Sequence, residues 1–424
     1  MVRPFAVVLL GGLLFTPSIT VTPSARTLSA PAATSSYVVS LRPGAGDPAA
    51  VAAEQARALG FSVTFLYRSA LTGYAADLTP AAHAALKADP RVAAVEADTP
   101  VAATEQVTPQ GIDRVDADAS VTASIDDIDA PRVEINVAVL DTGIDTEHPD
   151  LSVAGGADCA KGRGYDDEYG HGTHIAGVIG ALDNGVGVVG VAPGARLFAV
   201  RVLDEHGKGT TRELLCGVDW VTSTRSDADP NNDIEVANLS LGATGGDDGQ
   251  CGQVDGDLLH QAICRSVAAG VTYIVAAGNT AEDAIYSAPA SYDEVITVSA
   301  LADADGLPGS VGGSPSCRED EDDTLAAFSN YGVDVDLIAP GVCIYSTLPI
   351  DGAMLGSSGG YGTLTGTSFA APHVAGAAAL YLNTHPGTSP SQVRDALVGS
   401  GTTDWNNVDD PDGIKEPLCS VASF

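Results

Sequence analysis

Ser368 is the residue of this chain whose surroundings best suit nucleophilic chemistry. It lies in the segment GTSFAAPHVAG (residues 366–376), where a turn of small residues runs into an apolar stretch, residues 369–382, that predicts a buried helix. Pro372 fits the first turn of that helix, because an N–H group has no partner there. A serine at this place faces unpaired backbone N–H groups and the positive end of the helix dipole, which favours an anionic nucleophile. The alternative is that Ser368 only caps the helix.

Other residues of the chain are suited to activate such a serine. Asp141 follows the β-branched stretch 135–140, which predicts a buried strand, and His171 opens a predicted helix. In a shared site, Ser368 Oγ attacks a carbonyl carbon and His171 takes its proton and passes it to the leaving amine. Asp141 holds the imidazole in one tautomer. Asn279, at the end of another predicted strand, can donate a hydrogen bond to the oxyanion of the tetrahedral intermediate.

Four motifs together resemble those of the subtilisin-like serine peptidases. They are VLDTG (139–143), GHGTHIAG (170–177), AAGN (276–279) and GTSFAAP (366–372), in the family's order of Asp, then His, then Ser. Each motif alone is weak evidence, whereas four in order are very specific. The resemblance covers nearly all of the chain after its first residues and implies a serine endopeptidase that acts on protein and peptide substrates.

The resemblance also implies which residues bind substrate. Ser240, Leu241 and Gly242 match the strand that lines the family's first specificity pocket and pairs with an extended peptide. The opposite wall of that pocket is matched by Ala276, Ala277 and Gly278. Small residues on both walls indicate a roomy apolar pocket, and therefore broad specificity with a preference for large apolar side chains. Taken alone, residues 240–242 are also typical of an ordinary turn after a strand.

A structural calcium site is implied by the same comparison. The loop LDNGVGV (182–188) resembles the family's tight calcium loop. The implied ligands are backbone oxygens and oxygen-bearing side chains, which suit a hard cation: Gln106, Asp150, Leu182, Asn184, Val186 and Val188. Without the family, an Asn/Gly loop after a helix indicates only a helix end. Asp303 is a candidate for a second, weaker calcium site.

Three other classes of protein are alternatives to a subtilisin-like peptidase. The acid-acting relatives of the family replace the oxyanion Asn by Asp and the catalytic His by Glu, which Asn279 and His171 exclude. An α/β-hydrolase esterase requires G-x-S-x-G and the order Ser, Asp, His, and this chain has neither. A catalytically silent subtilisin fold used for binding is the remaining alternative, and the intact set of four catalytic residue types argues against it.

The start of the chain resembles an export signal. Arg3 carries the positive charge, residues 5–15 are apolar, and small residues follow, so we expect a signal peptide over residues 1–25, with an end that could lie as late as about residue 34. The apolar stretch is too short for a membrane anchor. We therefore expect a secreted, extracellular protein, and a monomer.

The net charge of −35 excludes one class of partner. It arises from 55 acidic and 20 basic residues, so the chain lacks the basic patches that nucleic-acid binding requires. Such acidity suits a soluble secreted protein. It fits either a saline habitat, where salt screens the self-repulsion, or simply an acidic, GC-rich genome.

The elements predicted before residue 101 have the order β-α-β-β-α-β of the split, ferredoxin-like α+β sandwich. They lie at 37–41, 48–59, two strands within 62–78, 80–88 and 92–97. This domain, residues 36–101, resembles the family's inhibitory propeptide, which acts as a folding chaperone and is cut off. A permanent N-terminal domain is the alternative. Residues 99–105 are expected to be a linker, with the maturation point between about 97 and 105.

Residues 106–424 alternate predicted strands and helices, which indicates an α/β catalytic domain with a mainly parallel sheet covered by helices on both faces. The strands are expected at 135–140, 197–203, 235–239, 271–276 and 295–300, and the helices at 172–182, 211–223, 257–269, 364–382 and 390–398. Active sites of such sheets lie at the carboxyl ends of the strands. The segment 318–323 looks like an acidic insertion, and Asp247–Asp248 and Asp409–Asp410 are expected to be solvated turns.

Seven cysteines lie in the later part of the chain, and with the export signal they favour disulfides. Sequence does not determine the connectivity; our preferred pairs are Cys251–Cys264, Cys317–Cys343 and, third, Cys159–Cys216, which leaves Cys419 over. His148, His174 and His373 have no carboxylate partner in the pattern, so we expect them to be structural, hydrogen-bonding histidines.

Overall fold

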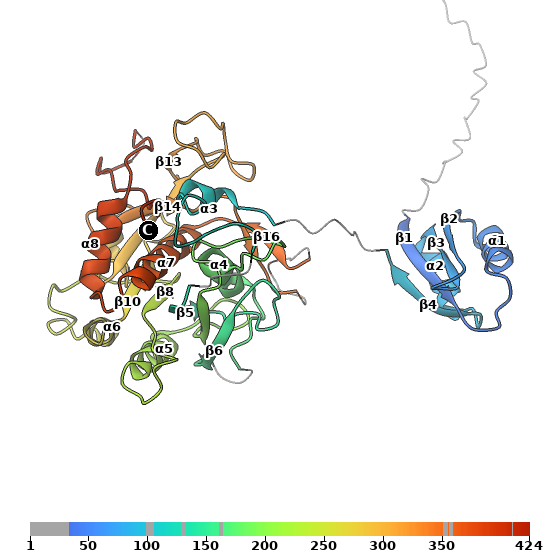
Figure 1. The fold of residues 1–424 in the computed structure, drawn as a ribbon, viewed down its shortest axis with the longest axis horizontal. Coiled ribbons are helices and arrows are strands. Elements are labelled where there is room, and N and C mark those ends of the chain that lie inside the picture. The colour runs from blue at the N-terminus through green and yellow to red at the C-terminus, as the bar shows by residue number, and fades with distance from the viewer. Residues whose placement is uncertain are drawn as a thin grey trace, which may run out of the picture. The chain divides into compact units, whose positions relative to one another are not determined.

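The computed structural model describes residues 34–98, 106–128, 133–160, 164–350, 355, 359–408 and 410–424. The chain separates into two compact units, one up to residue 102 and the other from residue 103 (Figure 1). The expected signal peptide lies outside the described residues. No described helix is both long enough and apolar enough to cross a membrane.

The first unit has the predicted β-α-β-β-α-β order. Its elements are β1 (Ser35–Leu41), α1 (Pro48–Leu59), β2 (Val63–Tyr67), β3 (Gly73–Leu78), α2 (Pro80–Ala88) and β4 (Val92–Ala97). The strands form an antiparallel sheet in the order β2-β3-β1-β4. The two helices bury small apolar residues against it around the core residues Val39, Tyr74 and Leu86. The ferredoxin-like expectation is therefore confirmed.

Among the described residues, the second unit is built on an eight-stranded sheet. Seven strands run in the order β13-β12-β10-β8-β5-β7-β6, and β14 pairs with β12. Their bounds are β5 (Asn136–Asp141), β6 (Val153–Asp158), β7 (Arg196–Arg201), β8 (Val236–Leu239), β10 (Thr272–Ala276), β12 (Ile296–Ala302), β13 (Thr324–Leu325) and β14 (Leu337–Pro340). All pairs are parallel except β12–β13.

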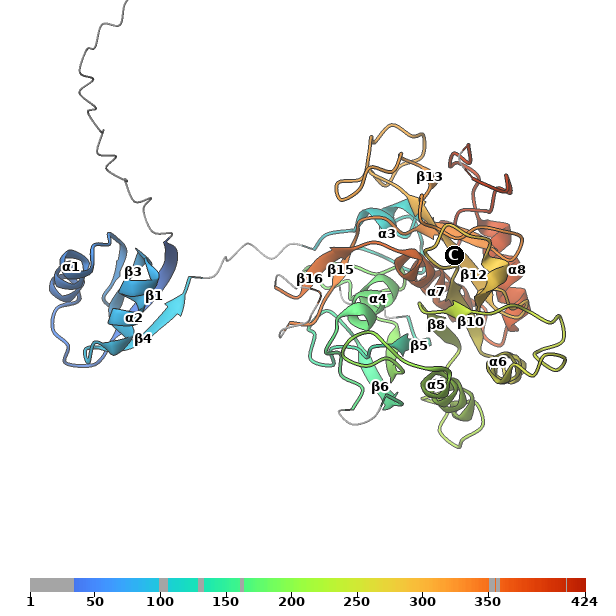
Figure 2. The same cartoon turned by 180° about the vertical axis from the view of Figure 1, so that it is seen from behind.

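Helices cover both faces of this sheet, as Figure 2 shows from behind. Their bounds are α4 (His171–Gly180), α5 (Thr211–Thr224), α6 (Leu258–Ala268), α7 (Thr367–Thr384) and α8 (Pro390–Ser400). Alternate residues of β5 serve the two faces: Val137 and Val139 pack with α4 and α7, whereas Ala138 and Leu140 pack with α5 and α6. The predicted α/β architecture is confirmed, and α4 and α7 meet where His171 and Ser368 stand.

Several short elements were not predicted from the sequence. They are α3 (Gln110–Arg114), β9 (Ala243–Thr244), the 3-10 turn η1 (Ala284–Tyr286), β11 (Ser287–Ala288) and the hairpin of β15 (Ile344–Thr347) with β16 (Tyr361–Leu364). The sheet strands β6, β13 and β14 were also missed. Strands of two to four residues, or with two glycines as in β6, carry too little alternation of apolar and polar residues to be recognised.

The three preferred disulfides are confirmed. Cys159–Cys216, Cys251–Cys264 and Cys317–Cys343 are bonded, with Cα–Cα distances of 5.8, 6.0 and 5.8 Å. Cys419 is free and buried, and its burial raises the pKa of the thiol to about 12. The leftover cysteine is therefore an inert core residue.

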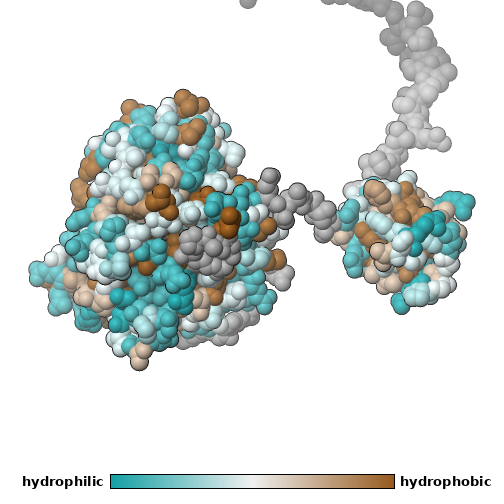
Figure 3. All heavy atoms as spheres, viewed as in Figure 1, coloured by the Kyte–Doolittle hydropathy of each residue, from teal (hydrophilic) through white to brown (hydrophobic). Residues whose placement is uncertain are grey.

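The expectation for the acidic turns is wrong where the structure describes them. Asp247 and Asp248 have side chains only 13% and 6% exposed, and Asp410 is 9% exposed. Asp409 lies outside the described residues. Half of the acidic insertion is also buried: Asp320, Asp322 and Asp323 are buried, and Asp322 and Asp323 accept hydrogen bonds from backbone N–H groups of the loop before them. Hydrophilic side chains still spread over much of the visible face of the second unit (Figure 3).

Candidate active site

Asp141 and His171 form a direct pair at the carboxyl end of β5. Asp141 is the last residue of that strand and is fully buried, and its Oδ1 lies 2.8 Å from His171 Nδ1 and accepts from Thr142 N, also at 2.8 Å. A carboxylate accepts hydrogen bonds, so Nδ1 of His171 carries the proton. The Nε2 of His171 is then the free, basic nitrogen.

The start of α4 holds His171 in place through a residue that the sequence analysis missed. Asp167 is buried, and its carboxylate accepts from Gly170 N at 2.8 Å and from Thr173 N at 2.9 Å. Burial lowers the pKa of His171, but the charge of Asp141, its hydrogen bond and the charge of Asp167 together raise that pKa above its ordinary value. The capping preferences that mark a helix start apply to the N-cap, which is Gly170 here, so they give no signal for Asp167.

Ser368 stands at the second position of α7 and faces Ser240, the residue after β8. Ser368 Oγ donates to the backbone oxygen of Ser240 at 3.2 Å, and Ser240 Oγ donates to the backbone oxygen of Ser368 at 2.7 Å. Asn238 Nδ2 donates in turn to Ser240 Oγ at 2.9 Å. Two hydrogen bonds therefore join Ser240, at the end of β8, to Ser368, at the start of α7.

The helix around Ser368 begins within the expected range 364–382, two residues before the apolar stretch 369–382. α7 starts at Thr367, with Gly366 as its N-cap, so Ser368 is not a cap and Pro372 lies in the second turn, not the first. Because proline has no N–H, it cannot donate to the carbonyl four residues earlier, which is that of Ser368. Ser240 Oγ supplies the missing donor.

Asn279 lies beside Ser368 and is oriented by Thr367. Its Oδ1 accepts from Thr367 N at 2.8 Å and from Thr367 Oγ1 at 3.0 Å. Because the oxygen of the amide is fixed by these two donors, the NH₂ group must occupy the opposite side. Asn279 and Ser368 line one cavity, so this donor group lies beside the serine.

That cavity, of about 370 Å³, collects all six residues expected to bind substrate: Ser240, Leu241, Gly242, Ala276, Ala277 and Gly278. The short β9–β11 pair closes it on one side. The sequence analysis did not identify Thr280, Glu282, Tyr286 and Asn330, which also line it. They follow the AAGN motif in a loop or come from distant parts of the chain.

A larger hollow of about 860 Å³ adjoins this cavity. It shares the segment 240–244 with it and extends past His171 to Lys208 and Tyr292. An extended peptide laid along residues 240–242 would thus have its side chains in both hollows and its backbone next to His171 and Ser368.

The residues expected to bind calcium are brought together around the loop of residues 182–188. Gln106 Oε1 accepts from the backbone N–H groups of Asn184 and Gly185 at 2.9 and 3.0 Å. Asp150 contacts Asn184 Nδ2 at 3.1 Å and Val188 N at 2.9 Å. Side chains far apart in sequence therefore meet at one loop.

The charge of this loop fits a cation. Asp150 is fully buried, and burial raises the pKa of its carboxyl to about 6 despite its hydrogen bonds. Among the described residues, no Lys or Arg forms an ion pair with it, so the buried negative charge has no protein counter-ion. Oxygen donors around one buried carboxylate are what Ca²⁺ prefers.

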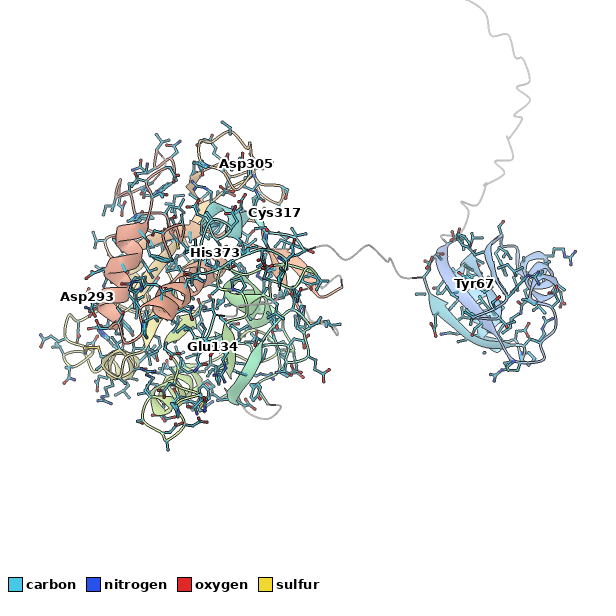
Figure 4. All side chains as sticks on the ribbon, viewed as in Figure 1. Tyr67, Glu134, Asp293, Asp305, Cys317 and His373 are labelled. Carbon is cyan, nitrogen blue, oxygen red and sulfur yellow. A yellow bond between two sulfur atoms is a disulfide. The ribbon has the colours of Figure 1, made fainter. Side chains whose placement is uncertain are left out.

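Asp303, the candidate for a second calcium site, has a different environment. Its Oδ2 lies 3.0 Å from Nε of Arg114, a buried guanidinium, and its carboxylate also lies close to those of Asp305 and Asp322. Asp305, which is labelled in Figure 4, lies in the loop between β12 and β13. The cluster already has one counter-charge from the protein, and a cation there stays a prediction.

The other histidines near the motifs hydrogen-bond to backbone oxygens. His148 Nε2 lies 2.9 Å from Gly360 O, His174 Nε2 lies 3.0 Å from Ile344 O, and His373 Nδ1 lies 2.8 Å from Phe369 O. Burial lowers the pKa of His174 to about 3 and that of His373, labelled in Figure 4, to about 4. They have the neutral, structural environment that was expected of them.

A peptidase of the subtilisin type is the class that this fold and site define, and comparison with known proteins identifies the same class. The subtilase family matches residues 133–413, and the peptidase inhibitor I9 family matches residues 36–104. The chain belongs to the subtilase family and is a serine endopeptidase with an inhibitor-type propeptide. The resemblance found in the sequence is confirmed.

Individual relatives agree with this family. Subtilisin DY of Bacillus licheniformis is 38% identical over 272 residues, which is 63% of this chain and 84% of that protein. Subtilisin NAT of Bacillus subtilis subsp. natto is 36% identical over 333 residues, 77% of this chain and 75% of that protein. Among solved structures, a cold-adapted subtilisin-like serine proteinase matches with a TM-score of 0.54 and 31% identity, covering 74% of this chain and 98% of that one.

Proposed function

We propose that Ser368 is the nucleophile, His171 the general base and Asp141 the residue that orients His171, with Asn279 as oxyanion donor. The convergence of Ser368, Asn279 and the Asp141–His171 pair on two adjoining hollows carries the proposal. Substrate binding requires Ser368 Oγ to rotate from the Ser240 carbonyl toward His171 Nε2. His171 then takes the hydroxyl proton as Oγ attacks the carbonyl carbon of the peptide.

The tetrahedral intermediate places a negative charge on the former carbonyl oxygen. The NH₂ group of Asn279 and the backbone N–H of Ser368, in the first turn of α7, are the donors for that oxygen. His171 gives its proton to the leaving amine, and water then releases the acyl group from Ser368. Residues 240–242 and 276–278 are proposed to form the two walls of the pocket that binds the substrate side chain next to the scissile bond.

Outside the site, we propose an exported precursor that cuts itself. The export-type start of the chain and the I9 segment support this, with residues 36–101 as the inhibitor and chaperone and 106–424 as the mature, monomeric enzyme. Ca²⁺ held by Gln106, Asp150, Leu182, Asn184, Val186 and Val188 is proposed to stabilise it.

The experiment that tests the catalytic proposal labels the protein with an active-site fluorophosphonate. Wild type should be labelled at Ser368, and the Ser368→Ala variant should remain unlabelled and accumulate as the uncut precursor. Ser391→Ala, at an exposed serine of α8, is the matched control, since it keeps the nucleophile and should still be labelled. Normal maturation of the Ser368→Ala variant would falsify self-processing, and labelling of that variant would refute the assignment of Ser368.

A further inference from the structure

His260 is a fully buried histidine that the catalytic proposal does not use. It lies in the first turn of α6, and its ring stacks on Tyr292 with centroids 4.0 Å apart and an interplanar angle of 6°. Its Nε2 lies 2.8 Å from Glu294 Oε2. Because an ionised carboxylate only accepts hydrogen bonds, Nε2 carries the proton, and in the neutral ring Nδ1 presents a lone pair.

That lone pair faces two carboxylates. Nδ1 of His260 is buried without a hydrogen-bond partner, and Asp247 Oδ1 and Asp248 Oδ1 lie 3.6 and 3.9 Å from it. Within the described ranges, neither of these aspartates nor Glu294 forms an ion pair with Lys or Arg. A lone pair opposed to two carboxylates is repulsive, so a positive charge, either a proton or a metal ion, is needed between them.

The distances decide between the proton and the metal ion. An N–H···O hydrogen bond spans about 2.7–3.2 Å, so a proton on Nδ1 is too far from both carboxylates to be shared well. A transition-metal ion lies about 2.0–2.2 Å from each N or O ligand, so its ligand atoms can be up to about 4.2 Å apart. The separations of 3.6 and 3.9 Å between His260 Nδ1 and the two aspartate oxygens lie within that limit.

We propose that His260 Nδ1 and Asp247 Oδ1 bind a divalent transition ion of the zinc type, with the carboxylate of Asp248 adding negative charge beside it and water completing its coordination. A nitrogen ligand favours zinc over calcium. Glu294 is not a ligand in this proposal; its carboxylate accepts the hydrogen bond from Nε2 and so orients the His260 ring. Neither the family comparisons nor the four motifs point to this site.

Hydrogen bonds from backbone N–H groups fix the positions of the Asp247 and Asp248 carboxylates. Asp247 accepts from Gly249 N at 2.6 Å and from Asp293 N at 2.9 Å; Asp293 is labelled in Figure 4. Asp248 accepts four backbone N–H groups, from residues 250, 252, 254 and 255, at 2.7–3.3 Å. Each oxygen of Asp247 therefore keeps a lone pair, so Asp247 is the ligand, whereas both oxygens of Asp248 are engaged and contribute charge.

The site lies behind one wall of the substrate groove. Tyr292, which stacks on His260, and Asp257, which accepts a hydrogen bond from the Tyr292 hydroxyl, both line the larger hollow. The disulfide Cys251–Cys264 ties the same loop to α6. A metal ion here links the loop of residues 247–257, α6 and the 292–294 segment, and so stabilises that wall.

The test measures zinc binding to the full-length Ser368→Ala chain, which cannot digest itself, in saturating calcium. Competition against a chromophoric zinc chelator should reveal one tight equivalent, and zinc should raise the melting temperature. In the same background, Asp247→Asn and His260→Gln should each weaken that equivalent at least tenfold. His206→Gln is the matched control, since His206 is an exposed histidine beside Glu205, and it should leave the tight equivalent unchanged.

Asp247→Asn keeps the buried ring and guards against a failure of His260→Gln to fold, which circular dichroism will show. Anomalous scattering at the zinc edge from a soaked crystal should place the ion between His260 and Asp247. The proposal is overturned if no zinc binds tightly or if both variants keep the tight equivalent. A second contrary result is that zinc does not bind and His260→Gln removes a pH dependence of the melting temperature. The latter result would identify a buried imidazolium.

Discussion

The hydroxyl groups of Ser240 and Ser368 each donate a hydrogen bond to the other residue's backbone oxygen, at 2.7 and 3.2 Å. This exchange joins the end of a central strand to the start of α7. It exists because Pro372 cannot donate to the Ser368 carbonyl, which therefore accepts from a side chain instead. The nucleophile's backbone is thus positioned by a residue of the substrate-binding segment.

Ser240→Ala should lower the free energy of unfolding by about 1–3 kcal/mol, because it leaves the Ser368 carbonyl buried and without a donor. kcat should fall more than KM rises, since Ser240 positions the nucleophile. Adding Pro372→Ala restores an N–H four residues after Ser368 and should recover most of the loss. Urea unfolding of the four proteins in a double-mutant cycle measures this, and effects that add within about 0.3–0.5 kcal/mol would contradict the coupling.

Asn279→Ala should lower kcat by about 10²–10³ with little change in KM, because the donor acts on charge that develops only in the transition state. That magnitude is known from a subtilisin and is carried over to this relative. Thr367→Val should cost less, since it removes the Oγ1 donor to Asn279 at 3.0 Å but keeps the backbone donor at 2.8 Å. Steady-state kinetics on a peptide anilide compares them; an equal fall in both variants would argue against direct action by Asn279.

The pH profile should reflect the raised pKa of His171. Proton transfer from Ser368 needs a neutral imidazole, so kcat/KM should fall as pH drops through this pKa, with a midpoint above the ordinary value of about 6.5. Asp167→Asn removes one of the charges that raise the pKa and should move the midpoint to lower pH. The exposed neighbour Asp166 is the control: Asp166→Asn should leave the midpoint in place. A midpoint near pH 4 would exclude His171 as the base.

Removal of calcium should destabilise the enzyme through Asp150. A cation that binds only the folded state contributes about 2.7 kcal/mol at a hundredfold excess over its Kd, so EDTA should lower the melting temperature of the Ser368→Ala chain. Asp150→Asn in that background should lower it too and abolish the effect of EDTA. Asp305→Asn, in the separate acidic cluster, should keep the EDTA effect. If EDTA changes nothing in the parent chain, the assignment of Gln106, Asp150 and Asn184 is wrong.

The sequence alone determined the architecture and the residue types of the site. A long apolar stretch such as residues 369–382 must lie in the core. Alternating strands and helices favour a parallel sheet with helices on both faces, because that arrangement buries the apolar side of every element. The motifs could be recognised because each is a short, continuous segment of sequence around one of Asp141, His171 and Ser368. The sequence did not determine the disulfide connectivity, but the three preferred pairs are the ones that the structure contains.

Only the tertiary structure decided which groups share a proton, a donor or a charge. The role of Ser240 depends on a contact across 128 residues of sequence. Asp167 raises the pKa of His171 through its negative charge, which only the fold brings near the imidazole. Asp247 and Asp248 were expected to be solvated because two adjacent acidic residues usually face water. Long-range packing against His260 instead buries them, and packing of that kind leaves no periodic signal in the sequence.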